Sequence, residues 1–285
     1  MKMELECLPC IMKQAYNTAI RATDDDTVIR EILNRTAEYV KTLDMDQTPA
    51  DASNFAYTIT RELTGKPDPY EKEKIEFNDI CLSIAPEISR RIDMSEDPVY
   101  TAIKAAIFGN LIDLGIGLAF DIEKDLETIF DCEPDINDYE ELKDILGSGR
   151  KKILYLGDNT GEIVFDRLLV EKIKDDHDVT FVVKRGPIIN DATMADAEYV
   201  GMTDIVRVID TGSDGIGVKW DAISDEFRKS YDSADVIISK GQGNFETNSD
   251  KGSNIFFLLK AKCERVACKL NVNFGDIVIK RGPVI

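Results

Sequence analysis

The stretch from Lys151 to Asp166 constrains the fold of this chain more than any other. It begins with a short apolar run, residues 153–156, which is closed by Gly157 and is typical of a buried parallel strand. Apolar residues then recur at helical spacing from Ile163 onward. Strand, tight turn and helix in this order form the unit of open α/β sheets, whose ligands bind at the carboxyl ends of the strands. The sequence therefore predicts a ligand site at this turn.

Beyond residue 147, strand-like runs alternate with helical patterns. The helical patterns cover 162–173 and 221–230. The strand-like runs cover 153–156, 179–183, 205–208, 236–238, 265–268 and 277–279. This alternation predicts an α/β protein, with a mainly parallel sheet flanked by helices in a Rossmann-like three-layer core.

The first part of the chain has a different pattern. Between residues 4 and 98, apolar residues recur at steps of three and four, which predicts helices over 28–40, 51–63 and 78–92. Pro86 is expected to kink or break the last of these. We therefore predict an all-helical N-terminal subdomain over 1–98 and an α/β domain over 99–285.

Residues 101–120 predict a buried helix, because apolar side chains cover most of its faces. Asn110 and Asp113 lie three residues apart and hence on one side of it. Buried polar groups need partners. The two side chains are therefore expected either to make hydrogen bonds within the core or to contact a ligand.

The charge of the chain restricts its partners. It carries 35 basic and 54 acidic residues, a net charge of −19 at pH 7. Acid spread along the whole chain opposes binding to nucleic-acid phosphates.

The longest apolar run, 105–120, contains polar residues and is too short to span a bilayer, and the N-terminus does not resemble a signal peptide. We therefore predict a cytoplasmic protein with no nucleic-acid or membrane partner, whose six cysteines stay reduced.

Oxygen donors follow two of the predicted strands. Asp158 and Asn159 end the first strand, and Asp191 follows the second. Neighbouring strands lie about 4.8 Å apart, so these donors can meet. Two carboxylates at such range repel each other unless a cation lies between them, and an all-oxygen set suits Mg²⁺ or Mn²⁺ better than zinc. The alternative for any single aspartate in such a turn is a helix N-cap.

A glycine-rich turn at 239–246 follows the strand over 236–238. Its glycines would let backbone N–H groups approach a ligand, and Lys240 offers a positive charge for phosphate. The turn lacks P-loop spacing, and the usual alternative for such a lysine is exposure to solvent. Lys184, in the basic turn before Asp191, is a further candidate phosphate contact. Residues 210–217 form another glycine-rich strand end, either a substrate loop or a plain flexible one.

Other catalytic arrangements are disfavoured. The only histidine, His177, lies in a charged turn and is expected to be solvated, which argues against a Ser-His-Asp triad. Thr160 stands two residues after Asp158, where aspartyl-phosphate enzymes of the haloacid-dehalogenase type keep a second acid. Cys7 and Cys10 form a CxxC pair that could be half a zinc site or a redox pair, although reduced, partly buried thiols are the favoured interpretation.

Several motifs in the same order resemble the DUF89 family of metal-dependent damage-control phosphatases, in its prokaryotic and archaeal CxxC-containing branch. They are CLPC near the start, FGNLID at 108–113, GDNTGE at 157–162, INDAT at 189–193 and SKGQGNFE at 239–246. The resemblance implies a helical part packed on an α/β core, and hydrolysis of phosphate esters with Mg²⁺, Mn²⁺, Co²⁺ or Ni²⁺. The sequence at 210–217 departs from the family's usual proline-containing turn, which leaves the shape of the substrate pocket open.

By motif, the resemblance implies roles for individual residues. The metal ligands would be Asp158, Asn159 and Asp191. Lys240 would contact the phosphate, Asn244 would supply a second polar contact, and Asn110 and Asp113 would lie near the substrate pocket. Glu162 is a candidate for orienting the attacking water, and its alternative is an acid that favours the start of a helix.

We therefore predict an enzyme, a metal-dependent phosphoric-monoester hydrolase acting on small phosphorylated metabolites such as sugar phosphates or damaged phosphometabolites. One alternative is a non-catalytic sensor that binds a phospho-metabolite or nucleotide in the same pocket. A carboxyl methyltransferase ranks last, because the chain has no clear GxGxxG or methyl-donor loop. The sequence identifies neither the substrate nor the native metal nor the oligomeric state.

Overall fold

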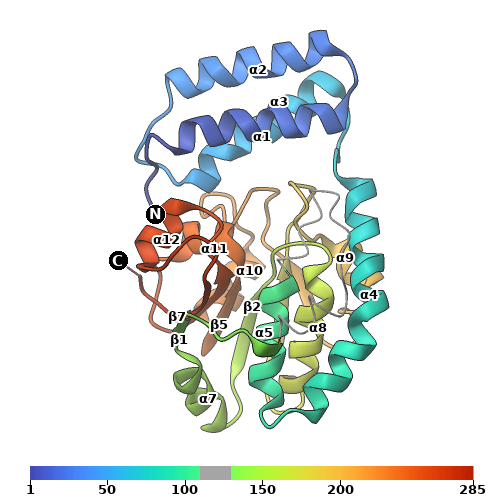
Figure 1. Cartoon of the computed structure of the whole chain (residues 1–285), viewed down its shortest axis with the longest axis vertical. Coiled ribbons are helices and arrows are strands. Elements are labelled where there is room, and N and C mark those ends of the chain that lie inside the picture. The colour runs from blue at the N-terminus through green and yellow to red at the C-terminus, as the bar shows by residue number, and fades with distance from the viewer. Residues whose placement is uncertain (110–129, 285) are drawn as a thin grey trace.

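A seven-stranded sheet forms the centre of the molecule, which is described by a computed structural model covering residues 1–109 and 130–284 (Figure 1). The spatial order of the strands is β1-β7-β6-β5-β2-β3-β4. Neighbouring strands are parallel except for β6 and β7, which are antiparallel. The strands are β1 (Ile136–Asn137), β2 (Lys152–Leu156), β3 (Asp178–Val183), β4 (Arg207–Asp210), β5 (Val236–Lys240), β6 (Ile255–Lys260) and β7 (Ile277–Arg281). The predicted α/β fold with a mainly parallel sheet is confirmed.

The strand order reverses between β2 and β5. From β2 the chain adds β3 and β4 on one side, then returns to place β5 and β6 on the other. Ile153 of β2 consequently pairs with Val179 of β3 on one edge and with Val236 of β5 on the other. Such a reversal opens a crevice at the carboxyl ends of the central strands, where ligands of doubly wound sheets bind.

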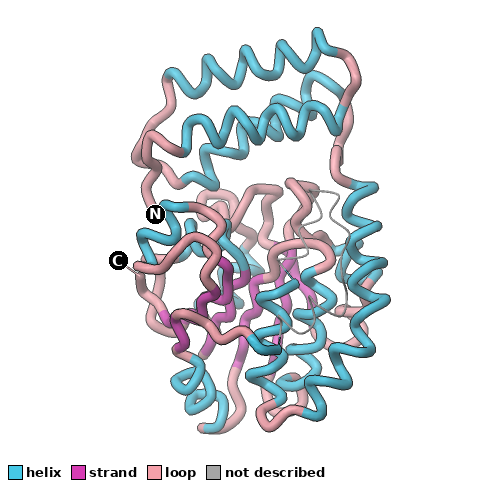
Figure 2. The backbone as a smooth tube through the Cα atoms, in the orientation of Figure 1, coloured by secondary structure: helices cyan, strands magenta, loops and turns pink. Residues whose placement is uncertain are grey.

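Helices surround this sheet, as the cyan segments around the magenta strands in Figure 2 show. Those before the sheet are α1 (Cys7–Ala22), α2 (Asp26–Lys41), α3 (Pro49–Thr64), α4 (Glu71–Met94) and α5 (Pro98–Phe108). The helices that alternate with the strands along the chain are α7 (Tyr139–Gly147), α8 (Glu162–Ile173), α9 (Met194–Tyr199), α10 (Asp225–Asp232), α11 (Gly241–Asn248) and α12 (Glu264–Leu270). Helices α1, α2 and α3 lie together beyond one end of the sheet (Figure 1).

Side-chain alternation along the strands builds a core on each face of the sheet. Ile153 and Tyr155 of β2 belong to the core that includes side chains of α4, α5 and α8. Leu154 and Leu156 belong to the core that includes Phe227 of α10 together with side chains of α11 and α12. Both faces are therefore covered, which explains why β2 and β5 are apolar runs without polar alternation.

Local sequence signals explain several helix ends. Asp25 caps α2 by accepting hydrogen bonds from the backbone N–H groups of Thr27 and Val28. Thr48 caps α3, and Gly65 ends it in a left-handed conformation. Pro86 was expected to kink or break its helix. It lies inside α4, which continues past it, so the helix is not broken.

The predicted strands need correction in three places. Residues 265–268 are not a strand but part of α12, whose buried residues Val266, Ala267 and Leu270 follow helical spacing. The run Ile255–Lys260 was missed, although it forms β6 in the middle of the sheet. Strand β4 also begins two residues later than the predicted run at 205–208. The predicted helix over 101–120 appears as α5 up to Phe108, and residues 110–120 lie outside the described part of the chain.

His177 is buried rather than solvated, with 6% of its surface exposed. Its Nδ1 accepts a hydrogen bond from the backbone N–H of Lys151 at 3.3 Å, and burial lowers its pKa. It directly precedes β3 and therefore lies at the end of the sheet opposite the strand carboxyl ends. In the described part of the chain, no helix is both long and apolar enough to cross a membrane.

Candidate functional site

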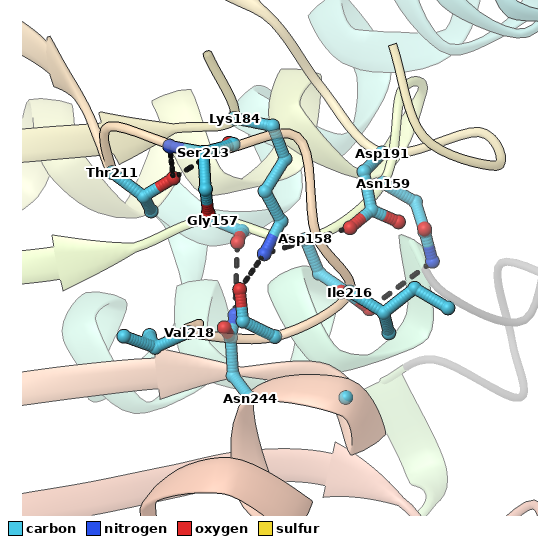
Figure 3. Close-up of polar contacts among 12 residues, drawn as sticks. Gly157, Asp158, Asn159, Lys184, Asp191, Thr211, Ser213, Ile216, Val218 and Asn244 are labelled. Atoms are coloured by element: carbon cyan, nitrogen blue, oxygen red, sulfur yellow. Dashed lines mark hydrogen bonds and ion pairs between the residues drawn. The ribbon is translucent and has the colours of Figure 1, made fainter. Parts of the chain in front are cut away.

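The turns after β2 and β3 are joined to each other directly. The backbone N–H of Thr160 donates to the carbonyl of Asn190 at 2.8 Å, and that of Ala192 donates to the carbonyl of Asp158 at 2.8 Å. Asn159 and Asp191 form an antiparallel bridge between the two turns. Because directly bridged residues point to the same side, the side chains of Asn159 and Asp191 lie together. The amide of Asn159 donates to Oδ2 of Asp158 at 3.2 Å, so the three side chains gather in one place, as Figure 3 shows.

The two carboxylates of this group are held in a buried environment. Asp191 is 3% exposed, and burial raises its pKa to about 7, with Asp158 adding to the shift and Lys184 opposing it. Burial also raises the pKa of Asp158, and nearby lysines only partly offset that effect. The negative charge on both groups is therefore unfavourable in the protein alone, and a cation between them would stabilise it.

The position of the Asp158 carboxylate depends on a neighbouring glycine. Gly241, at the start of α11, has a φ of +75°, a conformation that side chains other than hydrogen disfavour. A Cβ atom built on it would lie 1.9 Å from Oδ2 of Asp158. The glycine-rich turn after β5 thus lets its backbone lie directly against the carboxylate.

The donors fit a hard divalent cation. Oδ2 of Asp191 is buried and accepts no hydrogen bond, so one oxygen of the group has no hydrogen-bond donor of its own. The amide of Asn159 donates to Oδ2 of Asp158, and an amide side chain also carries a carbonyl oxygen of the kind that hard cations bind. Among the described residues, no three histidine, cysteine, aspartate or glutamate side chains form a metal-binding group. The set of two carboxylates and one amide therefore favours Mg²⁺ or Mn²⁺ over zinc.

These side chains open into a cavity of about 710 Å³. Its walls come from the segments that follow β2, β3 and β4, from the end of β6, from the start of α11, and from helices α1, α3 and α4. They include four basic and three acidic side chains, in a chain of net charge −19. The lining residues are Lys13, Gln14, Asn17, Arg21, Tyr57, Tyr70, Glu73, Phe77, Asp158, Asn159, Ile189, Asn190, Asp191, Ile216, Gln242, Gly243, Lys260 and Lys262.

Lys240 does not line this cavity. Its side chain is fully buried, and Nζ donates to the carbonyl of Ala106 at 2.8 Å, to Asp166 at 2.6 Å and to Glu162. Tyr155 donates to the same Asp166 oxygen at 2.6 Å. The assignment of Lys240 as a phosphate contact is therefore corrected, because its ammonium group pairs with the buried acids Glu162 and Asp166.

Glu162 is buried in the same cluster and does not line the cavity either. Burial raises its pKa to about 8, while Lys240 opposes the shift and Asp166 adds to it. For Lys240, burial alone opposes the charged form, but the two carboxylates outweigh it and the pKa lies above its usual value. Burial also raises the pKa of Asp166, while Lys240 opposes that shift. The raised pKa of Glu162 favours its protonated form at neutral pH, beside a charged Lys240. This position does not suit Glu162 for orienting a water molecule in the cavity.

Lys184 and Asn244 support the site from behind. Lys184 is 2% exposed, with its Nζ donating to the carbonyl of Gly217 and lying 3.6 Å from Oδ2 of Asp191 (Figure 3). The side-chain amide of Asn244 donates to the carbonyls of Gly157 at 3.0 Å and Lys240 at 2.8 Å, and thereby joins the ends of β2 and β5. Neither residue lines the cavity, so the structure gives both a positioning role. Asn110 and Asp113 lie outside the described residues.

Two lysines on the cavity wall were missed by sequence reasoning. Lys260 ends β6, and Lys262 follows two residues later. Burial lowers the pKa of Lys260, and the neighbouring charge of Lys262 adds to this effect. The signal that could have revealed them was the apolar run before them, which places a lysine at the carboxyl end of a central strand.

The CxxC motif opens α1. Cys7 is buried and Cys10 is exposed, and both are free thiols, as are the other cysteines. Cys10 Sγ accepts a hydrogen bond from Gln14 at 3.4 Å, and burial raises the pKa of Cys7.

Comparison with known proteins identifies relatives over the whole length. The family model described as the damage-control phosphatase ARMT1-like domain matches residues 3–278. The chain is 36% identical to a damage-control phosphatase of Pyrococcus horikoshii, covering 99% of this chain and 98% of the relative. It is 35% identical to a damage-control phosphatase of Archaeoglobus fulgidus, covering 98% and 99%. The crystal structure of a DUF89 family protein from Pyrococcus horikoshii superimposes with a TM-score of 0.91 at 36% identity, covering 99% of both chains.

Proposed function

Because this chain belongs to the damage-control phosphatase ARMT1-like (DUF89) family, we propose that it is a metal-dependent phosphatase acting on phosphate monoesters of small metabolites. The family membership and the phosphatase names of the relatives support hydrolysis of phosphorylated compounds. The metal dependence and the substrate class are inferred from the site of this chain.

One observation carries the proposal. Asp158, Asn159 and Asp191 come from the carboxyl ends of two adjacent strands, and they meet at the floor of a cavity of about 710 Å³. Both carboxylates are buried in a way that disfavours their charge, and one of their oxygens accepts no hydrogen bond. An acidic patch in contact with solvent would show neither feature. Both features are expected where buried carboxylates bind a cation.

The residues of the cavity can perform distinct parts of the reaction. The Asp158, Asn159 and Asp191 side chains would hold a divalent cation, which would supply positive charge next to a phosphoryl oxygen. Lys260 and Lys262, on the same wall, would neutralise further charge on the phosphoryl group. The buried Lys184 holds Asp191 in place, because its ammonium lies 3.6 Å from the carboxylate. The cavity itself limits the orientations of the ester, which lowers the entropic cost of reaching the transition state.

We expect phosphate release from a panel of phosphomonoesters, for example p-nitrophenyl phosphate and several hexose monophosphates, in the presence of Mg²⁺, Mn²⁺, Co²⁺ or Ni²⁺. Treatment with EDTA should abolish turnover, and adding the metal back should restore it, since the proposed cation would supply the positive charge at the floor of the site. Phosphate would be measured continuously, with circular dichroism confirming that the chelated protein remains folded.

Folded protein that releases no phosphate from any ester with any of these metals would contradict the proposal. Turnover that is unchanged in EDTA would contradict the metal dependence alone.

A further inference from the structure

Helix α1 differs in charge from the rest of the chain. The chain contains 54 acidic residues among 285, yet the 16 residues of α1 include none. Its only charged side chains are Lys13 and Arg21. The helix is therefore locally cationic within a strongly acidic protein, and both of its charges lie on the cavity wall.

The spacing of these residues places them on one face. Lys13, Asn17 and Arg21 follow each other at steps of four, and such residues lie above one another along an α-helix. Gln14 joins them on the cavity wall. Two cations thus flank two amides, an arrangement that offers only hydrogen-bond donors and neutral acceptors to a bound molecule.

Arg21 is fixed before any ligand arrives. Its Nε donates to both carboxylate oxygens of Glu73, at 2.9 and 3.1 Å, and its Nη1 donates to the carbonyl of Asn17 at 2.9 Å. The guanidinium also lies 5.0 Å from the ring centroid of Tyr70. The Nη2 amino group makes no hydrogen bond with the described residues, so one edge of a rigid cation remains available.

Lys13 is a different kind of cation. Its side chain is exposed, and it makes no hydrogen bond or ion pair with any described residue. Its place at the cavity is therefore not explained by a polar contact within the described part of the chain. A lysine of this kind adapts to a charged group on a ligand at little cost to the fold.

A tyrosine connects this face of α1 to the floor of the site. Tyr57 of α3 donates a hydrogen bond to the side-chain oxygen of Gln14 at 3.2 Å. The same tyrosine is close enough to Asp191 for the carboxylate to raise the pKa of its hydroxyl, an effect that adds to the larger effect of burial. The cationic face of α1 and the oxygen donors of the floor therefore line one continuous space, which Tyr57 also lines.

We propose that Lys13 and Arg21 bind a second anionic group of the substrate, so that the preferred substrates are small metabolites carrying both a phosphate ester and another phosphate or a carboxylate. This inference rests on the proposed phosphatase function. The phosphate ester to be cleaved lies at the floor, and the second anion lies against α1. The amides of Gln14 and Asn17 bind hydroxyl groups between the two.

The test compares matched esters that differ only in the second group. Glycerol phosphate and phosphoglycerate differ by a carboxylate, and a hexose monophosphate and the corresponding hexose bisphosphate differ by a phosphate. For the wild-type protein we expect kcat/KM to favour the member with the second anion by about tenfold in at least one pair, as expected for a hydrogen-bonded charge. The pair in which the preference is larger identifies the second group as carboxylate or phosphate.

Lys13→Met should remove most of this preference, because it should lower kcat/KM far more for the esters with a second anion than for the neutral-tailed esters. Lys13 makes no hydrogen bond or ion pair with a described residue, so the fold should be unchanged. Arg21→Gln should act in the same direction, with thermal unfolding measured because this residue also binds Glu73. Lys72→Met is the matched control: Lys72 is 90% exposed, lies outside the cavity lining, and its loss changes the net charge equally.

Equal kcat/KM for both members of each pair in the wild-type protein would overturn the inference. A Lys13→Met variant that loses activity equally on both members, or a Lys72→Met variant that shows the same change in preference, would also overturn it. In these cases turnover of the neutral-tailed esters still supports the phosphatase. Absence of turnover with every ester would instead overturn the proposed function and the inference together.

Discussion

Replacing Asp158 with asparagine is expected to lower kcat/KM for phosphate esters by about a thousandfold, comparable to the loss of a principal electrostatic group in an active site. Asparagine preserves the size of the side chain but removes the negative charge, which a divalent cation needs from this ligand. The measurement is steady-state phosphate release at saturating metal, compared with Asp232→Asn, which removes an exposed acid at the end of α10.

The same substitution should not destabilise the metal-free protein. Burial raises the pKa of Asp158, so its ionised form is less favourable in the folded than in the unfolded state. At pH values above both pKa values the charge therefore opposes folding, and the neutral asparagine removes that opposition. A variant that keeps activity within tenfold of wild type, or that loses activity only because it unfolds, would contradict the role of Asp158 as a metal ligand.

Replacing Lys240 with methionine is expected to cost about 3–5 kcal/mol of unfolding free energy, the range found when one partner of a buried ion pair is removed. Lys240, Glu162 and Asp166 are all fully buried, and among the described residues the lysine is the only cation paired with the two acids. Denaturant unfolding measures the change. Lys143→Met is the control, because its ion pair with Asp97 is partly exposed and should be worth less than about 1 kcal/mol.

Glu162→Gln separates the structural role of this cluster from a catalytic one. Since the pKa of Glu162 is raised to about 8, the residue is mainly protonated at neutral pH, and glutamine resembles that form. We expect this variant to lose less stability than Lys240→Met and to keep most of its phosphatase activity. A near-complete loss of turnover in stable Glu162→Gln protein would restore the sequence-based assignment of Glu162 to catalysis. A Lys240→Met protein as stable as wild type would contradict the account of the cluster.

The oxygen donors could be predicted from sequence because their position depends on a local rule. A buried strand closed by glycine fixes where its carboxyl end lies, and parallel neighbours bring Asp158 and Asp191 to the same edge. No long-range information was needed beyond the pairing of consecutive strands. The same rule would have found Lys260 and Lys262 if the run Ile255–Lys260 had been recognised as a strand.

The direction in which a side chain points was harder to predict. Lys240 follows the same strand-end rule, but its side chain points into the core, where it pairs with Glu162 and Asp166 of α8, two acids that only the folded chain brings next to it. The strand prediction for residues 265–268 was wrong for another reason. A short apolar run fits a strand or a helix equally well, and here the burial of Val266 and Leu270 favours the helix.

The contribution of α1 to the cavity could not be predicted from the sequence at all. Lys13 and Arg21 lie more than 130 residues before Asp158, and only the packing of the helical layer over the sheet edge brings them to the same space. The absence of acids from α1 was visible in the sequence, but its meaning depends on what the helix faces.

Anomalous diffraction from crystals grown with Mn²⁺ tests the central claim most directly, since it locates the ion independently of activity. We predict a manganese peak bonded to the side-chain oxygens of Asp158, Asn159 and Asp191, which disappears in crystals of the Asp158→Asn variant. A protein that hydrolyses phosphate esters with Mn²⁺ but shows no peak among these three side chains, or binds the ion elsewhere, would contradict it.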